Sequence, residues 1–277
     1  MVQRGNDPMS FAEELQRQAD DNRRDIVDMI HTANSGHPGG SLSVIDLLTA
    51  VYATDVDLKQ KQRSRVVLSK GHAAPALYAV LHQYGILSDE EMKTLRTMDS
   101  RLQGHPCTQR LPEADATTGL LGQGLSIGIG MAIAKRDTGD DHRVYVICGD
   151  GEMNEGQIWE AAGQAVHYGL NNLICIVDKN GLALSGTTQQ VMSNGDLQAK
   201  FSSFGWQAET IDGHDMQQIL DALARARAWQ DGPYAIIANT VKGKGVSFME
   251  NNVSYHSSGI AGELYAQAVQ ELEKEGC

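Results

Sequence analysis

The chain has 277 residues, 41% of them hydrophobic, and a formal net charge of −12 at pH 7. This length is sufficient for one large α/β core, and the acidic balance argues against nucleic acid or an anionic membrane as the main partner. The four cysteines (107, 148, 175 and 277) lack CxxC spacing, and no apolar run reaches 18 residues. We therefore expect no disulfide, no zinc site, no membrane span and, since residues 1–10 lack a signal-peptide pattern, a cytoplasmic protein.

Apolar periodicity predicts an alternation of helices and strands along the chain. Helices are predicted over 12–33, 44–52, 73–84, 88–97 (a solvated polar stretch), from the Gly-rich turn at 119–124 to 136, and over 215–229 and 262–276. Strands are predicted over 66–69, 144–148, 173–177, 206–211 and 234–241, and a helical stretch separates the second from the third. This order predicts a doubly wound, mostly parallel sheet with helices on both faces.

The most informative motif closes two of these strands. Gly-Asp-Gly (149–151) follows the strand at 144–148, and Asn180 follows the strand at 173–177. A right-handed crossover usually leaves such strands adjacent with level ends, so Asp150 and Asn180 are expected to meet. A carboxylate and an amide oxygen suit Mg²⁺ or Ca²⁺, and the amides at Gly151 and the following helix start can face a phosphate. A Gly turn and an Asn in the left-handed region would explain the three residues alone. The full spacing is typical of thiamine diphosphate enzymes.

Histidine placement gives a second signal. Of nine histidines, His37, His72 and His105 lie in predicted turns beside Gly or Pro, where an imidazole can point into a cleft. The sequence favours an ordinary surface or core role for the histidines in predicted helices or a charged loop (31, 82, 142 and 167), and a capping-region role for the histidine at 214.

Seven blocks resemble the N-terminal half of transketolases in order and spacing, across roughly residues 20 to 260. They are SGHPGG (35–40), LSKGHAAPALYAV (68–80), GHP (104–106), TTGLLGQGLS (117–126), GDGEMNEG (149–156), DGHD (212–215) and KGKG (242–245). The resemblance implies a thiamine diphosphate-binding fold and transfer of a two-carbon ketol unit from a ketose to an aldose. It also implies thiamine diphosphate and Mg²⁺ (or Ca²⁺) as cofactors. The thiamine group would supply most of the chemistry, and the protein would orient and polarise it.

By the same resemblance, His37 and His105 contact the donor sugar, and His72 lies near the diphosphate and the substrate. His256 matches a histidine in a terminal His-Gly-x-Pro motif whose Gly and Pro are replaced here, and is expected to transfer protons at a substrate oxygen. The metal ligands are expected to be Asp150, Asn180 and the backbone oxygen of Leu182. The expected cofactor-binding residues are Lys70, His72, Gly119, Leu121, Gly151, Glu155, Asn180 and Lys244, of which Glu155 resembles a residue linking paired active sites.

Full transketolases continue into a pyrimidine-binding domain that supplies an activating glutamate, and residues 1–277 match only the diphosphate-binding domain. We therefore expect the N-terminal subunit of a split transketolase, which acts on sugar phosphates with a separately encoded C-terminal subunit in an α2β2 assembly. Two enzyme alternatives are a related thiamine-dependent synthase and the alpha subunit of a 2-oxoacid dehydrogenase first component. The SGHPGG, LSKGH and GHP blocks favour sugar chemistry. A catalytically silent scaffold is the alternative from another class.

Overall fold

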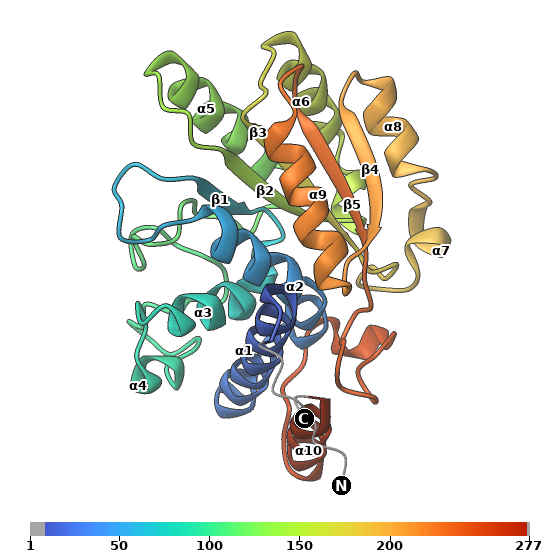
Figure 1. Ribbon diagram of the computed structural model, residues 1–277. Helices are drawn as coiled ribbons and strands as arrows, with labels where there is room; N and C mark the ends of the chain where they lie inside the picture. The colour runs from blue at the N-terminus through green and yellow to red at the C-terminus, as the bar shows by residue number, and fades with distance from the viewer. Residues whose placement is uncertain (1–8, 276–277) are drawn as a thin grey trace, which may run out of the picture.

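The structure is a computed structural model and describes residues 9–275. A five-stranded sheet in the order β1-β2-β3-β5-β4 lies at its centre, and each pair of neighbouring strands is parallel (Figure 1). The strands are β1 (Arg65–Leu68), β2 (Val144–Gly149), β3 (Leu173–Lys179), β4 (Gln207–Asp212) and β5 (Tyr234–Asn239). The predicted doubly wound parallel fold is confirmed.

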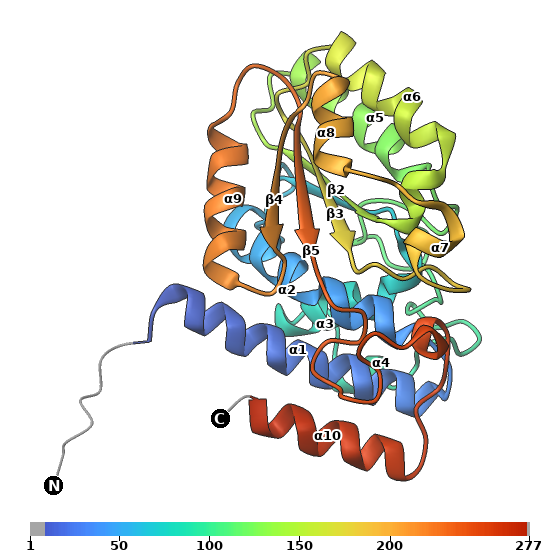
Figure 2. The same ribbon diagram turned by 90° about the vertical axis from the view of Figure 1, so that its right-hand side faces the viewer.

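Two apolar cores lie on opposite faces of the sheet because side chains alternate along each strand. Tyr145 and Ile147 face one core, which is completed by α1 (Phe11–Ala33), α2 (Pro38–Asp55), α3 (Ala74–Gln83) and α9 (Met216–Ala228). Val144 and Val146 face the other, which is completed by α5 (Gly124–Asp137), α6 (Gly156–His167) and α8 (Leu197–Ser203). Figure 2 shows α9 on one side of the sheet and α5, α6 and α8 on the other.

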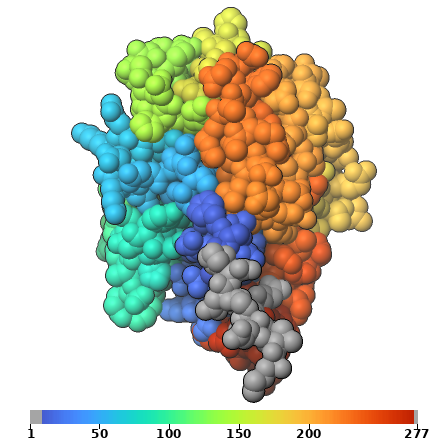
Figure 3. All heavy atoms as spheres, viewed as in Figure 1, coloured from blue at the N-terminus to red at the C-terminus, as the bar shows by residue number. Residues whose placement is uncertain are grey.

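The first helices also extend beyond the carboxyl ends of the strands. Figure 2 shows the strand arrows pointing toward α2, and Figure 3 shows the orange surface of α9 directly above the blue surface of α1. A buried network joins these helices: Asp46 of α2 accepts hydrogen bonds from Arg23 of α1 and from His214 Nδ1 (2.8 Å), while His214 Nε2 accepts from the Val241 amide (2.8 Å). His214 therefore connects α2 to the segment after β5. The residue that caps the start of α9 is Asp215, and not His214 as the sequence suggested.

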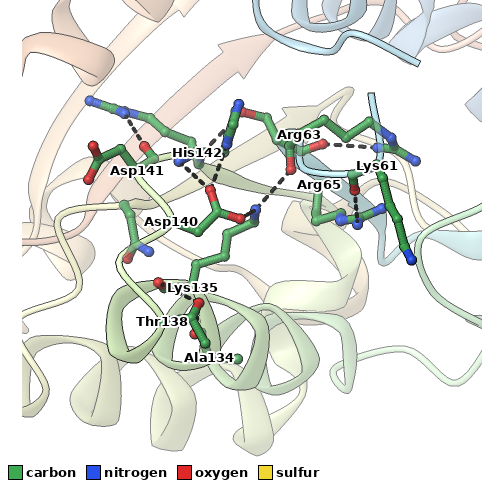
Figure 4. A network of polar contacts seen from close by, with 12 residues as sticks. Lys61, Arg63, Arg65, Ala134, Lys135, Thr138, Asp140, Asp141 and His142 are labelled. Atoms are coloured by element: carbon green, nitrogen blue, oxygen red, sulfur yellow. Dashed lines mark hydrogen bonds and ion pairs between the residues drawn. The ribbon is translucent and has the colours of Figure 1, made fainter. Parts of the chain in front are cut away.

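A separate ionic network closes the amino ends of β1 and β2 (Figure 4). Lys135 Nζ donates to the backbone oxygen of Arg63 (2.8 Å) and to Asp140 (2.7 Å), and His142 Nδ1 lies 2.6 Å from the same carboxylate. Asp115 accepts a two-point hydrogen bond from Arg63. These contacts fix the strand starts, at the end opposite Asp150 and Asn180.

Most predicted elements are confirmed, with three differences. The helix predicted over 88–97 is limited to α4 (Asp89–Met92), because the chain then turns through left-handed conformations at Arg96 (φ 60°) and Asp99 (φ 63°); its Met92 and Leu95 are buried, not solvated. Helix α2 begins at Pro38, well before residue 44, since proline favours the first helical turn. Helices α7 (Thr188–Met192) and α8 were not predicted. The predicted terminal helix is present as α10 (Glu263–Glu275).

Some sequence-based expectations concern residues outside the described part of the chain, namely those on residues 1–8 and on Cys277. Within residues 9–275, no helix has both the length and the apolar character needed to cross a membrane.

Candidate active site

The carboxyl ends of β2 and β3 lie level, as the strand-helix-strand pattern predicts. Gly149 pairs with Asp178 across the two strands, so Asp150 and Asn180 leave the sheet side by side. Asp150 Oδ2 accepts a hydrogen bond from the Gly181 amide (2.8 Å), and Oδ1 accepts from the Gly151 amide (3.0 Å). The Asp150 carboxylate thus joins the two strand ends, and the Gly151 amide that was expected to face a phosphate is bonded to Asp150 here.

A cavity of about 230 Å³ opens at these strand ends. Eight of the residues predicted to bind cofactor, metal or substrate line it: Lys70, His72, Leu121, Asp150, Gly151, Asn180, Leu182 and His256. Gly40, Gly149, Glu152, Ala183, Leu184 and Lys242 complete the lining. The structure therefore brings together segments that are more than 200 residues apart in the sequence.

A buried ion pair supports the floor of this cavity. The Lys70 ammonium group donates to Asp178 and to the Gly40 carbonyl (2.9 Å), and both charged side chains are essentially inaccessible to solvent. Burial alone would raise the pKa of Asp178, but Lys70, Ser43 and Thr240 donate to its carboxylate and hold that pKa below its ordinary value. Sequence reasoning missed Asp178, although an aspartate at the end of the apolar run LICIV was a visible signal.

The second cation at the cavity is Lys242, which was not among the predicted site residues. Lys242 Nζ donates to the Leu182 carbonyl (3.1 Å) and lies 2.8 Å from His256 Nδ1. Burial, and then repulsion from Lys70, lowers the pKa of Lys242 to about 8. Lys244 is not among the lining residues, and its ammonium group lies 3.7 Å from Glu250. Cofactor binding by Lys244 stays a prediction, and the turn at Gly243 (φ 81°) separates the two lysines of KGKG.

Four histidines from separate segments form one cluster, and two of them, His72 and His256, line the cavity. The ring centroid of His37 lies 5.3 Å from that of His72, 6.1 Å from that of His105 and 5.7 Å from that of His256. His72 and His256 stack at 5.2 Å. All four predicted catalytic histidines therefore meet, including His256, whose surrounding motif is altered.

Each imidazole in this cluster is held neutral. Burial, followed by the charge of Arg96, lowers the pKa of His37 to about 3, and burial with the charge of Lys242 lowers that of His256 to about 4. The pKa values of His72 and His105 are also lowered, mainly by burial. Neutral imidazoles can both donate and accept hydrogen bonds, which suits them to bind sugar hydroxyls and to move protons.

The loops around the cavity depend on Glu152, another residue that sequence reasoning missed. Its buried carboxylate accepts from the Gly122 amide (2.8 Å), the Gly149 amide (3.0 Å) and the Ser69 hydroxyl. Burial raises the pKa of Glu152. This side chain therefore joins the end of β2 to the Gly-rich turn before α5.

The predicted residues Gly119 and Glu155 lie outside the cavity lining. A Cβ at Gly119 (φ 140°) would lie 3.2 Å from the His105 ring, so this glycine permits the close approach of that histidine. The exposed Glu155 side chain packs over Gly122, at the start of α6. Neither residue contacts the cavity in the chain alone.

The donor set suits a hard divalent cation with a diphosphate. Asp150, Asn180 and the Leu182 carbonyl offer oxygen atoms, while Lys70 and Lys242 supply positive charge at the same cavity. Burial, and then repulsion from Asp178, raises the pKa of Asp150 to about 6, and a bound cation reverses such a shift. Within residues 9–275, no group of three or more His, Cys, Asp or Glu residues could hold a metal ion.

Comparison with known proteins agrees with this geometry. The model of the transketolase thiamine diphosphate-binding domain matches residues 15–275. This chain belongs to the transketolase family. One of its relatives, a subunit of the apulose-4-phosphate transketolase from Phocaeicola vulgatus, is 39% identical over 95% of this chain and 95% of its own length. A 6-deoxy-6-sulfo-D-fructose transketolase subunit from a Clostridium species is 40% identical over 95% of this chain and 98% of its own length.

Solved transketolases share the fold. The transketolase of Campylobacter jejuni superposes with a TM-score of 0.88 at 33% identity, over 96% of this chain and 43% of that protein. A Pichia stipitis transketolase in complex with sedoheptulose 7-phosphate also gives a TM-score of 0.88, over 95% of this chain and 41% of that protein. This transketolase-family chain thus spans less than half the length of the solved transketolases, but nearly the whole length of the two relatives named as subunits.

Proposed function

We propose that this chain is the diphosphate-binding subunit of a split transketolase that transfers a two-carbon ketol unit from a ketose to an aldose. The observation that carries this proposal is the meeting of four neutral histidines with a cavity that combines Asp150, Asn180 and two buried lysines. The oxygen ligands and the lysines suit a metal ion and a diphosphate, and the imidazoles suit sugar hydroxyls. This combination fits a thiamine-dependent enzyme that acts on sugars.

Thiamine diphosphate, when bound, supplies a nucleophilic carbon that accepts and passes on the two-carbon unit. Asp150, the Asn180 side-chain oxygen and the Leu182 carbonyl would hold Mg²⁺ (or Ca²⁺) on its diphosphate, and Lys70 and Lys242 would balance the negative charge. Leu121, which lines the cavity and is partly exposed, offers an apolar surface to the organic part of the cofactor.

The histidines act on the sugar. His37 and His105 would bind hydroxyl groups of the donor. His72 and His256 stack and line the cavity; His72 would lie near the diphosphate and the substrate, and His256 would move the proton at the substrate oxygen. The sugar in the name of one relative carries a phosphate group, and the sugar in the name of the other carries a sulfo group. We propose a ketose that likewise carries an anionic group, with phosphate as the first choice.

The relatives named as transketolase subunits imply a partner chain. We propose that the whole chain is one diphosphate-binding domain and that a separately encoded C-terminal subunit supplies the pyrimidine-binding domain. Two copies of each would form an α2β2 assembly, with Glu155 at the contact between paired sites, since that side chain is exposed at the start of α6.

The decisive experiment is reconstitution with the partner subunit. The mixed subunits should convert a ketose phosphate and an aldose acceptor only when thiamine diphosphate and Mg²⁺ are present, and neither subunit should be active by itself. Turnover of a 2-oxoacid would instead assign the dehydrogenase alternative. Cofactor binding without any ketol transfer from a panel of phosphorylated and sulfonated ketoses would contradict the proposal.

A further inference from the structure

Arg96 makes an unusual contact with the histidine cluster. One terminal nitrogen of its guanidinium lies 2.9 Å from His37 Nδ1, and the other donates to the Ser35 hydroxyl (2.7 Å). Within the described residues, no ion pair joins Arg96 to a carboxylate. The guanidinium therefore clamps the Ser-Gly-His turn before α2 and places an unneutralised positive charge beside His37.

The backbone at Arg96 is strained to make this contact. Its φ of 60° lies in the left-handed region, which is uncommon for a non-glycine residue and costs free energy. A bond from the Arg96 amide to the Leu102 carbonyl (2.8 Å) holds the turn. Gly104 leaves room for the guanidinium, because a Cβ there would lie 3.2 Å from Arg96 Nε. Sequence reasoning placed Arg96 at the end of a solvated helix and assigned it no role.

The chemistry of arginine decides the state of His37. A guanidinium has five N–H donors and no acceptor, and it does not lose its proton in proteins. His37 Nδ1 must therefore accept, so the neutral ring carries its proton on Nε2. The charged and titratable groups near His37 are Arg96, Lys242 and the three imidazoles of His72, His105 and His256. A proton on Nδ1 would face the Arg96 donor directly.

We propose that Arg96 is a positioning residue that fixes the tautomer of His37 and adds to the effect of burial in opposing its protonation, so that His37 presents an Nε2–H donor to the substrate. This inference rests on the proposed function for the identity of the substrate, but the state of the His37 ring does not depend on it. A merely structural arginine would hold the loop and leave the titration of His37 unmoved.

The test is the NMR titration of imidazole ¹⁵N signals in the full-length chain, with the His37 signal assigned from a His37→Asn variant. In the wild type, His37 should show a protonated Nε2 and an unprotonated Nδ1 and should not titrate between pH 8 and pH 5. In Arg96→Asn, His37 should begin to bind a proton at a higher pH than in the wild type, while burial and Lys242 still lower its pKa. Asparagine tolerates a positive φ but is too short to reach the ring.

The matched control is Arg101→Asn, because Arg101 lies in the same loop and bonds to Glu91 and Glu113 instead of His37. It should leave the His37 signal unchanged. A wild-type His37 that carries its proton on Nδ1 would overturn the inference, as would an Arg96→Asn variant with unchanged His37 titration and otherwise unperturbed histidine signals.

A second measurement follows the reconstituted enzyme. Arg96→Asn should move the acid limb of the kcat/KM pH profile to higher pH. The ratio of kcat/KM at pH 6 to kcat/KM at pH 8 should fall by up to tenfold in this variant, whereas Arg101→Asn should leave the ratio unchanged. An unmoved acid limb in an active variant would count against the inference. If the wild-type complex shows no ketol transfer, the proposed function fails, and the NMR result still decides the role of Arg96.

Discussion

The Asp150 carboxylate accepts a hydrogen bond from the Gly181 amide at 2.8 Å, which ties the carboxyl end of β2 to that of β3. The same carboxylate accepts a second hydrogen bond from a backbone amide, that of Gly151 (3.0 Å). Asp150 therefore has a structural role besides its expected role as a metal ligand. Truncation to alanine would remove both, so a subtler change is needed to separate them.

We predict that Asp150→Asn lowers Mg²⁺-dependent affinity for thiamine diphosphate by at least tenfold while the fold is retained. The amide oxygen can still accept from Gly181, but the negative charge that a divalent cation requires is lost. Isothermal titration of the reconstituted complex measures the affinity. Asp141→Asn, at an exposed position near the amino end of β2, is the control. Equal affinities for wild type and Asp150→Asn would refute the metal assignment.

Substitution of the cluster histidines should affect turnover more than binding. His37→Ala and His105→Ala are expected to lower ketol transfer by ~10²–10⁴-fold, which is typical when a positioned hydrogen-bond or proton-transfer group is removed. Neither residue lines the cavity, so the affinity for thiamine diphosphate should change little. Steady-state kinetics and titration of the same preparations check both statements. Parallel losses of cofactor and activity would place these residues in the cofactor site or the fold.

Glu152 should be important for stability. Glu152→Ala leaves the buried Gly122 amide, the partly buried Gly149 amide and the Ser69 hydroxyl without their acceptor, so the free energy of unfolding should fall by about 3 kcal/mol. Urea denaturation at neutral pH measures this change. Glu160→Ala on the exposed side of α6 should cost far less. A similar stability for the two variants would show that the Glu152 contacts contribute little.

The depressed histidine pKa values predict a loss of stability in mild acid. The pKa of His37 falls from 6.5 to about 3 on folding, so below about pH 6.5 the unfolded chain binds a proton that the folded chain does not. The free energy of unfolding must therefore decrease as the pH falls from 6.5 toward 3. In His37→Asn this decrease should be smaller between pH 7.5 and pH 5. Identical slopes in urea denaturation would contradict the depressed pKa.

The assembled enzyme should have two-fold symmetry. We expect a mass of about twice the sum of this 30.0 kDa chain and its partner, because one cofactor site needs domains from both chains and closed dimeric symmetry is the commonest arrangement. Sedimentation velocity on the separate subunits and on their mixture measures the masses. A stable 1:1 complex that is fully active would contradict the α2β2 assembly.

Sequence patterns were sufficient to predict the fold class and many of the residues that meet at the cavity. Strands of β-branched residues alternating with amphipathic helices allow few arrangements other than a parallel doubly wound sheet. Since parallel strands end at the same edge, the spacing of Asp150 and Asn180 was sufficient to predict their meeting. Placement in turns singled out His37, His72 and His105, the resemblance to transketolases added His256, and the structure brings the four together.

The burial of charged side chains and their contacts become visible only in the folded chain. Lys242 and Lys244 are equivalent in sequence pattern, and the turn at Gly243 selects Lys242 for the cavity. Asp178 and Glu152 matter because donors from distant segments surround them, which no local pattern encodes. Arg96 contacts His37 from a left-handed backbone conformation that helix propensity disfavours. Such contacts depend on the full packing of the chain, so periodicity and motif spacing could not predict them.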